Sequence, residues 1–328
     1  MPGIIFNFLL FFLPFIFIPI TSLNFEIPKV ILAEILIEFL FVFLILKSKF
    51  LVKKIQKKLL IPIVIIFLLS LNLSGSFFGN EFRMQGIFLL WHLMLFALIS
   101  SVYKLKILDF KYLKYLLIAE LILGFMIGFT VDGRIVGTIG EPNALASFAV
   151  FLLPFSGNFI LSIIVIFLTG SRAGLIAFVI GIIALFLVKR KFKLNKIVLI
   201  CVTLILFSLL VPFVTNPESI YENRSEIWKT AIQTGLKSPI LGNGFGNIEL
   251  GPRIDSSHNI ILDWWVQGGT VGLTAFLSLV YFTIKNFLYK NKTLYLISFL
   301  GLFTTMLFNP ASVVNLIAFW WLIGVSFS

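Results

Sequence analysis

Residues 159–188 read FILSIIVIFLTGSRAGLIAFVIGIIALFLV, and this stretch decides the class of fold. Two apolar runs, 159–169 and 173–188, are joined by a short turn that carries a single cation, Arg172. A helix that crosses the hydrocarbon core needs about 20 apolar residues, with about 17 at the lower end. The second run comes close to that length, and the first is shorter. The stretch therefore predicts two helices in a membrane, joined by a tight turn at its surface.

The composition of the whole chain agrees with this stretch. Of the 328 residues, 59% are hydrophobic and 12% are charged, whereas a soluble domain carries about 25% charged residues. A count of 39 phenylalanines and a mean hydropathy of +1.08 exclude a water-soluble fold. The net charge of +12 would suit nucleic-acid binding only if it were gathered on one exposed face. The composition predicts an integral membrane protein that binds no nucleic acid.

Twelve apolar runs divide the chain into candidate membrane spans. We expect residues 1–328 to form one all-α, polytopic membrane domain. The first run is expected to be a retained span rather than a signal peptide, because no basic segment precedes it. The runs are 4–20, 30–46, 59–73, 87–102, 113–129, 143–155, 159–169, 173–188, 197–214, 269–284, 294–308 and 311–327.

The distribution of lysine sets the predicted orientation. Short cytoplasmic loops hold an excess of Lys and Arg, and four basic clusters follow the second, fourth, eighth and tenth runs. With twelve spans and a cytoplasmic N-terminus, all four clusters face the cytoplasm. Merging the sixth and seventh runs would turn two clusters outward, so the charges favour twelve spans with both termini inside. The clusters contain Lys47, Lys49, Lys53, Lys54, Lys57, Lys58, Lys104, Lys106, Lys111, Lys114, Lys189, Arg190, Lys191, Lys193, Lys196, Lys285, Lys290 and Lys292.

One outward (periplasmic or extracellular) loop is large. Residues 215–258 separate the ninth and tenth spans, with Asn216 as a helix cap and Pro217 at the first helical position. We interpret this segment as an amphipathic helix on the outer bilayer surface. The glycines of the 242–247 turn indicate a close turn of the backbone rather than a nucleotide site. Apolar residues recur at helical spacing at Ile220, Ile227, Trp228, Ala231 and Ile232.

Five of the six arginines lie in outward loops, against the positive-inside pattern. An arginine fork grips a phosphate or a carboxylate in two places, so these residues are candidates for anion binding. For four of them, pairing with an acid nearby in the sequence, such as Glu81 beside Arg83, is an equally good explanation. Arg172 has no acidic neighbour and stands between Gly170 and Gly174, which favours anion binding. The five are Arg83, Arg134, Arg172, Arg224 and Arg253.

Two histidines stand in different surroundings. His258 opens the segment Ser257-His258-Asn259 at the start of an apolar run. Histidine moves protons most readily near neutral pH, which makes His258 a candidate base, with a structural role as the open alternative. His92 has only apolar neighbours in the sequence, and we expect it to be structural. No HExxH, CxxC or Asp-x-Asp pattern is present, so we expect neither a metal site nor a cofactor.

Three carboxylates lie within predicted spans. Glu34 and Glu38 share a helix face at i and i+4, and Glu120 lies near the middle of the fifth span. Carboxylates inside a membrane commonly mark ion or proton paths. They leave a transporter or a lipid-linked glycan flippase as an alternative of another class. Packing in the bundle interior, with hydrogen-bond partners or in the protonated form, is the structural explanation.

The outward arginines and His258 together suit chemistry on a phosphorylated molecule. The cytoplasmic loops are too small to hold a nucleotide-sugar domain, so such a substrate would arrive within the membrane, as a lipid-linked diphosphate does. Arginines would stabilise the charge on a departing diphosphate. A histidine would activate an acceptor hydroxyl. The residues therefore indicate a group transfer at the outer face.

Four segments in order carry a family resemblance. They are GRIVGTIGEPNALA at 133–146, TGSRAG at 169–174, RSEIW at 224–228 with SPILGNG at 238–244, and His258-Asn259 followed by Gly269 and Gly272. With these segments the chain resembles the O-antigen ligase and polymerase superfamily of bacterial polysaccharide enzymes.

The resemblance implies a GT-C-like helical fold in the bacterial cytoplasmic membrane and a metal-independent, inverting glycosyltransferase. Such enzymes transfer a glycan from undecaprenyl diphosphate to a hydroxyl of a glycan or lipid acceptor. The His-Asn signature favours a ligase, with a polymerase as the alternative. Arg172 and Arg224 would hold the donor diphosphate, and His258 would act at the acceptor. By the resemblance, the catalytic residues are His258, Arg172 and Arg224, and the substrate-binding residues are Arg134, Arg83, Asn259 and Asn143.

Overall fold

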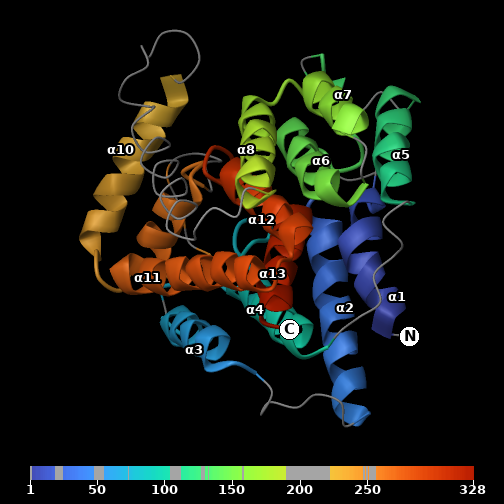
Figure 1. Ribbon diagram of the computed structural model, residues 1–328. Coiled ribbons are helices and arrows are strands. Elements are labelled where there is room, and N and C mark those ends of the chain that lie inside the picture. Colours follow the sequence, from blue (N-terminus) through green and yellow to red (C-terminus); the bar gives the residue numbers. More distant parts are fainter. Residues whose placement is uncertain are drawn as a thin grey trace.

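The described part of the chain is a bundle of α-helices (Figure 1). The computed structural model describes residues 2–18, 25–47, 55–72, 74–103, 112–126, 130–131, 133–156, 159–189, 222–246, 248, 250 and 256–328. The first helix, α1 (Pro2–Asn7), continues into a π-helical turn (Phe8–Phe12) and a 3₁₀ turn (Leu13–Phe15). The other helices are α2 (Ile27–Leu46), α3 (Lys57–Ser70), α4 (Ile87–Val102), α5 (Leu113–Met126), α6 (Pro142–Ser156), α7 (Phe159–Thr169), α8 (Arg172–Lys189), α10 (Glu222–Lys237), α11 (Ile260–Tyr289), α12 (Thr293–Met306) and α13 (Val313–Phe327).

The observed helices follow the predicted apolar runs. Apart from α10, each described helix overlaps one of those runs, and the all-α class is confirmed. A hairpin of two very short strands, β1 (Thr130–Val131) and β2 (Arg134–Ile135), adds a local turn before α6. Helices α6 and α7 are separate, as the lysine distribution predicts. The ninth run, 197–214, lies outside the described residues.

Among the described helices, α11 alone has both the length and the apolar composition needed to cross a membrane. Shorter apolar helices surround it, including α4, α6, α7, α12 and α13. Helix α2 has a suitable length but carries Lys29, Glu34 and Glu38. The number of twelve spans and the GT-C-like arrangement therefore stay predictions.

The outer faces of several helices are apolar. On α2, Ile31, Ile35 and Phe39 are exposed at helical spacing, and α5 and α7 expose isoleucines and phenylalanines in the same way. In contrast, the charged side chains of Lys29 and Glu120 are buried in the bundle. Soluble proteins rarely expose large apolar patches, and ionisable groups in membrane proteins face the bundle interior. This inverted distribution is the one expected of helices surrounded by hydrocarbon.

Alternate helices begin at the same end of the bundle. The carboxylate of Glu26, at the start of α2, accepts a hydrogen bond of 2.9 Å from the amide of Val313, at the start of α13. The Gln85 amide, just before α4, donates to the carbonyl of Ala311 at 2.9 Å. Asn315 in the first turn of α13 donates to the first turn of α6 at 3.2 Å. We call this end, where α2, α4, α6 and α13 begin, the Arg83 end.

The opposite end of the bundle gathers described lysines and the C-terminus. Gln56, which precedes α3, donates to the carbonyl of Phe327 at 2.7 Å. Lys290, at the end of α11, donates to the carbonyl of Ser326 at 3.0 Å, and Lys292 also contacts the last turn of α13. In the described part, these lysines and the predicted outward arginines thus lie at opposite ends. That the lysine end faces the cytoplasm, with both termini, stays a prediction.

Helix α11 is broken at Gly269, which has φ 61° and ψ −165°. The carbonyls of Val266 and Gln267 lose their helical partners there, and they accept hydrogen bonds of 2.9 and 3.0 Å from amides of residues 239–244. The same segment accepts a 2.9 Å bond from the amide of Thr270. The expected close turn around Gly242 is confirmed, and its role is to satisfy the backbone of the broken helix.

This geometry predicts that two glycines of α11 differ in how well they tolerate substitution by alanine. A Cβ atom at Gly269 would lie 2.2 Å from the carbonyl oxygen of Ile240, and the residue has a positive φ. A Cβ atom at Gly272 would lie 3.4 Å from a side-chain methyl of Leu69. We expect Gly269→Ala to lower the free energy of unfolding by about 2 kcal/mol or more, and Gly272→Ala to change it little. Thermal unfolding in detergent measures both, and equal melting temperatures would contradict this account.

The apolar face of α10 is covered by protein, which corrects the prediction that it lies on the bilayer. Ile227, Trp228 and Ala231 are buried against Leu262 and its neighbours in the first part of α11. The indole of Trp228 also donates to the carbonyl of Ser257 at 2.9 Å. The predicted start of this helix at Asn216 lies outside the described residues. The start of α11 supplies the apolar wall that the sequence pattern assigned to lipid.

Candidate functional site

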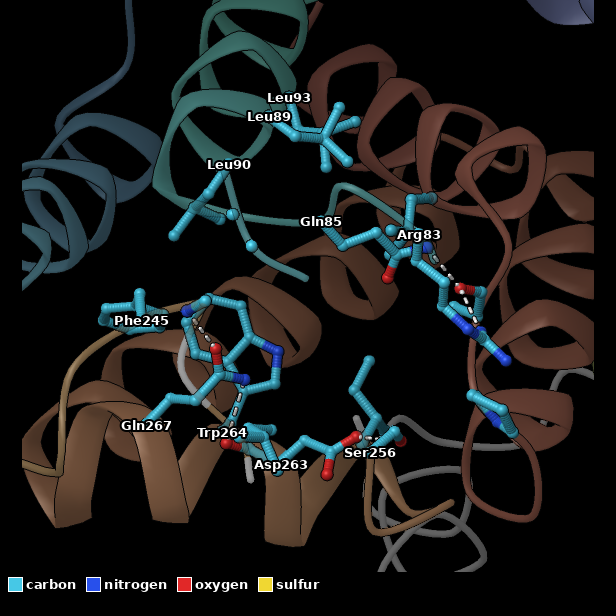
Figure 2. A pocket seen from close by; sticks show the side chains of 18 of the residues that line it. Arg83, Gln85, Leu89, Leu90, Leu93, Phe245, Ser256, Asp263, Trp264 and Gln267 are labelled. Atoms are coloured by element: carbon cyan, nitrogen blue, oxygen red, sulfur yellow. Dashed lines mark hydrogen bonds between the residues drawn. The ribbon is translucent and has the colours of Figure 1, made fainter. Parts of the chain in front are cut away.

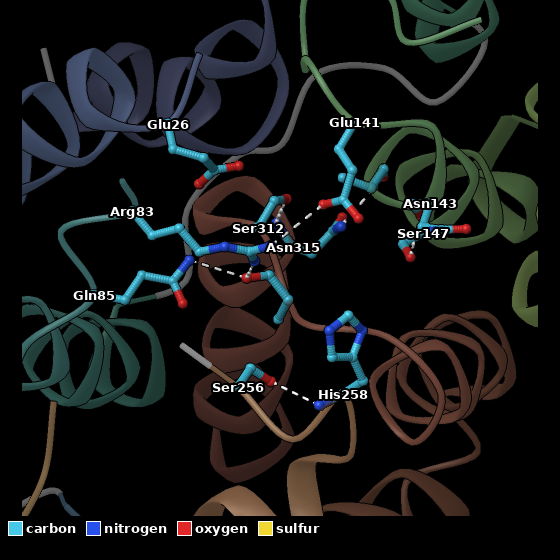
Figure 3. Close-up of polar contacts among 12 residues, drawn as sticks. Glu26, Arg83, Gln85, Glu141, Asn143, Ser147, Ser256, His258, Ser312 and Asn315 are labelled. Atoms are coloured by element: carbon cyan, nitrogen blue, oxygen red, sulfur yellow. Dashed lines mark hydrogen bonds and ion pairs between the residues drawn. The ribbon is translucent and has the colours of Figure 1, made fainter. Parts of the chain in front are cut away.

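His258 lies in a tight turn just before α11, and Asp263 orders this turn. The Asp263 carboxylate accepts hydrogen bonds from the Ser256 hydroxyl at 2.6 Å and from the Ser257 amide at 2.7 Å. The Ser256 hydroxyl oxygen in turn accepts the amide of His258 at 3.0 Å. His258 has φ 59°, which is uncommon for a residue other than glycine and is often found at functional sites. Figure 3 shows its imidazole directed away from Ser256 and toward the polar residues of the Arg83 end.

Asn259 is fully buried and is occupied with structural hydrogen bonds. Its side-chain oxygen caps α11 by accepting the amides of Ile261 at 2.9 Å and Leu262 at 3.3 Å. Its side-chain nitrogen donates to the carbonyl of Leu307, at the end of α12, at 3.1 Å. The side chain next to His258 therefore fixes the start of α11 on α12.

Arg83 lies at the centre of a polar cluster (Figure 3). Its guanidinium is 4.0 Å from the carboxylate of Glu141, 58 residues further along the chain, and donates to the Ala311 carbonyl at 3.5 Å. Burial raises the pKa of Glu26, and the nearby Arg83 charge opposes that rise. The pairing of Arg83 with Glu81, left open by the sequence, is replaced by this arrangement. Arg83 thus has its positive charge between two carboxylates, Glu26 and Glu141.

Arg134 and Asn143 are in direct contact. The Arg134 side chain, on β2, donates to the Asn143 side-chain oxygen at 3.2 Å and to the carbonyl of Thr169 at 2.7 Å. Asn143 lies in the first turn of α6, and Thr169 ends α7. Asp132, the acid beside Arg134 in the sequence, lies outside the described residues. Two predicted substrate-binding residues therefore meet where the 133–146 and 169–174 segments touch.

Arg172 is the first residue of α8, and its side chain is exposed. The Ser171 hydroxyl oxygen caps the helix by accepting the amide of Gly174 at 3.2 Å. Gly170 turns the chain with φ 61°, and a Cβ atom there would lie 3.3 Å from the Arg134 side chain. Arg172 therefore projects from a turn that Arg134 already contacts. Within the described residues, its guanidinium has no hydrogen bond or ion pair.

The side chain of Arg224 and all of Arg253 lie outside the described residues. The backbone nevertheless locates Arg224 in the first turn of α10. One turn later, Trp228 bonds to the carbonyl of Ser257, which is the residue before His258. The start of α10 is thus tied to the segment that presents His258.

A cavity of about 220 Å³ opens beside Arg83 (Figure 2). It lies between the loop before α4, helices α4 and α11, and the loop that joins α12 to α13. Its walls combine hydrogen-bonding groups with aromatic rings, which is the lining that a sugar ring prefers. The polar wall consists of Ser76, Asn80, Arg83, Gln85, Ser256, Asp263, Gln267 and Asn309, and the apolar wall includes Leu89, Leu93, Phe245, Trp264, Phe276, Met306, Phe319 and Trp320.

Residues 157–277 match the family model described as O-antigen ligase. This match supports a relationship of the segment to the O-antigen ligase and polymerase superfamily. No curated protein matches the chain in sequence. The matched segment contains three of the four motif segments, and the 133–146 segment precedes it. The family supports an enzyme of polysaccharide biosynthesis in a bacterial membrane, with a lipid-linked glycan and an acceptor as partners.

Two of the three carboxylates in the predicted spans make structural contacts: Glu120, which is buried, and Glu38, whose side chain is exposed. The Glu120 carboxylate accepts the amide of Thr138 at 2.7 Å and its hydroxyl at 2.6 Å. Lys29 donates to the Thr138 carbonyl at 2.9 Å from the other side. Glu38 lies 3.1 Å from a ring nitrogen of His92 and is a polar partner that the apolar neighbours of His92 in the sequence do not reveal. Glu120 and Lys29 therefore hold the loop that leads to Glu141 and Asn143.

Sequence reasoning missed four residues of the Arg83 end: Glu26, Gln85, Glu141 and Asn315. Glu141 lies within the 133–146 segment, so this motif contains the carboxylate but does not reveal that Arg83 is its partner. The side chain of Asn315 is buried, and its oxygen has no hydrogen-bond partner among the described residues. A buried acceptor of this kind is rare in native proteins and often marks a place for a ligand or water.

Proposed function

We propose that this protein transfers a glycan from undecaprenyl diphosphate to an acceptor hydroxyl at the outer face of the bacterial cytoplasmic membrane, as an O-antigen ligase. The observation that carries the proposal is the approach of distant segments at the Arg83 end. Arg83 approaches Glu141, Arg134 bonds to Asn143, and the turn of Arg172 touches Arg134. A polymerase of the same superfamily is the alternative within this class.

The Arg83 end is suited to a diphosphate. Helices α6 and α13 begin there, the start of α8 adjoins it through Arg134, which bonds to Asn143 and Thr169, and the first amides of a helix carry partial positive charge. Arg172 adds an exposed guanidinium that binds no carboxylate of the described residues. Arg172 and Arg224 hold the donor diphosphate in this proposal, and Arg134, fixed by Asn143, supports them. These groups supply positive charge without a metal ion.

The transfer itself needs a base and a stabilised leaving group. The acceptor hydroxyl gives its proton to the imidazole of His258 while its oxygen forms a bond to the anomeric carbon of the donor glycan. The bond from that carbon to the diphosphate oxygen breaks, and the electron pair leaves with the diphosphate, where the arginines stabilise it. Attack opposite the leaving group inverts the anomeric centre. Asp263 acts through Ser256 as a positioning residue for His258.

The cavity beside Arg83 is the proposed place for a sugar of the acceptor. Its walls offer amides, a carboxylate and a guanidinium on one side and aromatic faces on the other. The unpartnered oxygen of Asn315, near Arg83 in Figure 3, is able to accept a bond from a sugar hydroxyl. Asn259, whose polar atoms are occupied, has a positioning role in this proposal.

The transporter alternative depends on the carboxylates, and Glu120 tests it. Glu120→Ala leaves the amide of buried Thr138 without its acceptor, whereas the Thr138 hydroxyl keeps the carbonyl of Pro14 at 3.0 Å. We expect a loss of about 1–3 kcal/mol in the free energy of unfolding, with glycan transfer per folded molecule retained within about threefold. Thermal unfolding and transfer assays on the same preparation check this. Lost transport of a lipid-linked glycan, in a variant that keeps its melting temperature, would favour the transporter.

A panel of acceptors tests the proposed function and its alternative. Purified protein is incubated with an undecaprenyl-diphosphate glycan, either alone or with candidate lipid and glycan acceptors. A ligase produces a single addition to a separate acceptor, whereas a polymerase lengthens the donor glycan without one. The absence of any product with every acceptor would contradict both.

A further inference from the structure

Helices α3 and α11 form a groove of about 510 Å³ that lies outside the candidate site. One end of the groove is fixed by Lys58, whose ammonium lies 5.5 Å from the centre of the Phe282 ring. Toward the other end lie Ile65 of α3 and Val271 of α11. The groove therefore spans about two turns of α3, which is about 10 Å at the rise of an α-helix.

The walls of the groove are apolar and open to the outside. Ile61, Pro62 and Ile65 line one side, and Val271 and Ala275 line the other. The exposed fractions of Ile61 (57%) and Val271 (37%) show that the groove is not closed by other described residues. Apolar side chains exposed in this way need an apolar occupant, in the same manner as the outer faces of α2, α5 and α7.

The hydroxyl groups in the groove do not make it polar. Thr274 donates to the carbonyl of Thr270 at 2.6 Å, and Ser278 donates to the carbonyl of Thr274 at 2.8 Å. Two of the three hydroxyls that line the groove, those of Thr274 and Ser278, are thus satisfied within α11 itself. The groove has a wall suited to a hydrocarbon chain.

Two positive charges stand at one end of this apolar groove. Lys57 and Lys58 are exposed at the start of α3, and neither is within 4.0 Å of a carboxylate among the described residues. An apolar groove that ends in two ammonium groups without a carboxylate partner among the described residues is complementary to an amphiphile with one phosphate and a hydrocarbon tail.

We propose that this groove binds an anionic phospholipid. The headgroup phosphate contacts Lys57 and Lys58, and one acyl chain lies along Ile61 and Ile65 of α3 and Val271 of α11. The open flank favours a bilayer phospholipid over a polyprenyl phosphate, because an open groove exchanges with the most abundant lipid around it. This inference does not depend on the proposed transfer reaction.

The groove ends two residues after the break in α11. Val271 follows Gly269, and the amide of Val271 donates to the carbonyl of Ile240 at 3.1 Å. A chain packed on Val271 therefore supports the part of α11 that residues 239–244 hold in place. Occupancy is expected to appear as a higher melting temperature of the whole protein.

The test titrates the purified full chain in neutral detergent with phosphatidylglycerol and follows the melting temperature. We expect a saturable rise with phosphatidylglycerol and a much smaller one with phosphatidylcholine. The Lys57→Gln/Lys58→Gln variant should need a concentration of phosphatidylglycerol at least about tenfold higher for the same rise in melting temperature. Lys229→Gln/Lys237→Gln, which removes two exposed lysines from α10, should behave as the wild type.

A second variant tests the groove without changing charge. Ser278→Phe places a ring in the groove and should abolish the response to phosphatidylglycerol, and Thr274→Leu serves the same purpose if that variant does not fold. Equal responses of the wild type and the Lys57→Gln/Lys58→Gln variant would overturn the proposal. So would equal responses to the two phospholipids, or a stronger response to polyprenyl phosphate that Ser278→Phe removes.

Discussion

Replacement of His258 by asparagine is expected to lower the turnover number for glycan transfer by about a thousandfold, because a positioned general base contributes about 10²–10⁴. Asparagine tolerates the positive φ of this position better than alanine does. It also keeps the backbone amide that bonds to Ser256. The variant therefore removes the proton acceptor while keeping the turn. The initial rate of transfer at saturating donor and acceptor measures the effect.

The matched control is the other histidine of the chain. His92 lies in the bundle between α4 and α2, where its ring contacts Glu38 and the carbonyl of Phe88. His92→Asn should change the melting temperature and leave transfer per folded molecule within about threefold. If the His258 variant transferred at the wild-type rate, His258 would be no more than a structural residue of the turn.

The second large effect is expected at Arg172. Arg172→Ala should lower the catalytic efficiency for the lipid-linked donor by about 10²–10³, the loss typical of one group that stabilises developing charge. Alanine is well accepted at the start of a helix, and the Ser171 cap of α8 is unchanged. The melting temperature should therefore stay within about 2 °C of the wild type, because the exposed side chain makes no hydrogen bond or ion pair with another described residue that would be lost.

Arg172→Lys separates charge from geometry. Lysine keeps the positive charge but lacks the planar fork that binds a diphosphate in two places. We expect Arg172→Lys to recover part of the activity that Arg172→Ala loses. Its remaining defect should be larger in KM for the donor than in kcat. Lys229→Ala on α10 is the control for loss of one exposed cation. Wild-type kinetics in Arg172→Ala would remove this residue from the donor site.

The sequence predicted the helices well because an apolar run in a membrane protein has few alternatives to a helix. The separation of α6 from α7 was also predicted from the sequence. Joining the two runs would place two later lysine clusters on the outer side. The packing of the apolar face of α10 against α11 could not be predicted from the sequence. An amphipathic pattern indicates that one face of a helix is apolar, but not what covers that face. Trp228 on this face fits the pattern equally well whether it packs against lipid or against α11.

The sequence indicates candidate site residues one by one, but not the contacts between them. Arg134 and Asn143 belong to one quoted segment, and the structure shows them bonded to each other. Pairing of Arg83 with its sequence neighbour Glu81 was one of two open explanations, whereas its carboxylate partner is Glu141, the residue before α6. Residues that are far apart in the chain meet only through the packing of α2, α4, α6 and α13, which no local pattern encodes. The break at Gly269 was also hidden, because the glycine is visible in the sequence but the loop that bonds to it is not.

The most direct test of the central claim follows the lipid product. Purified protein, free of divalent cations, is mixed with an undecaprenyl-diphosphate glycan and an acceptor, and the release of undecaprenyl diphosphate is measured for the wild type, His258→Asn and Arg172→Ala. The account predicts release by the wild type in step with acceptor glycosylation, and a loss of at least about a hundredfold in both variants. Release at the wild-type rate by both variants, or glycosylation without release of the diphosphate, would contradict it.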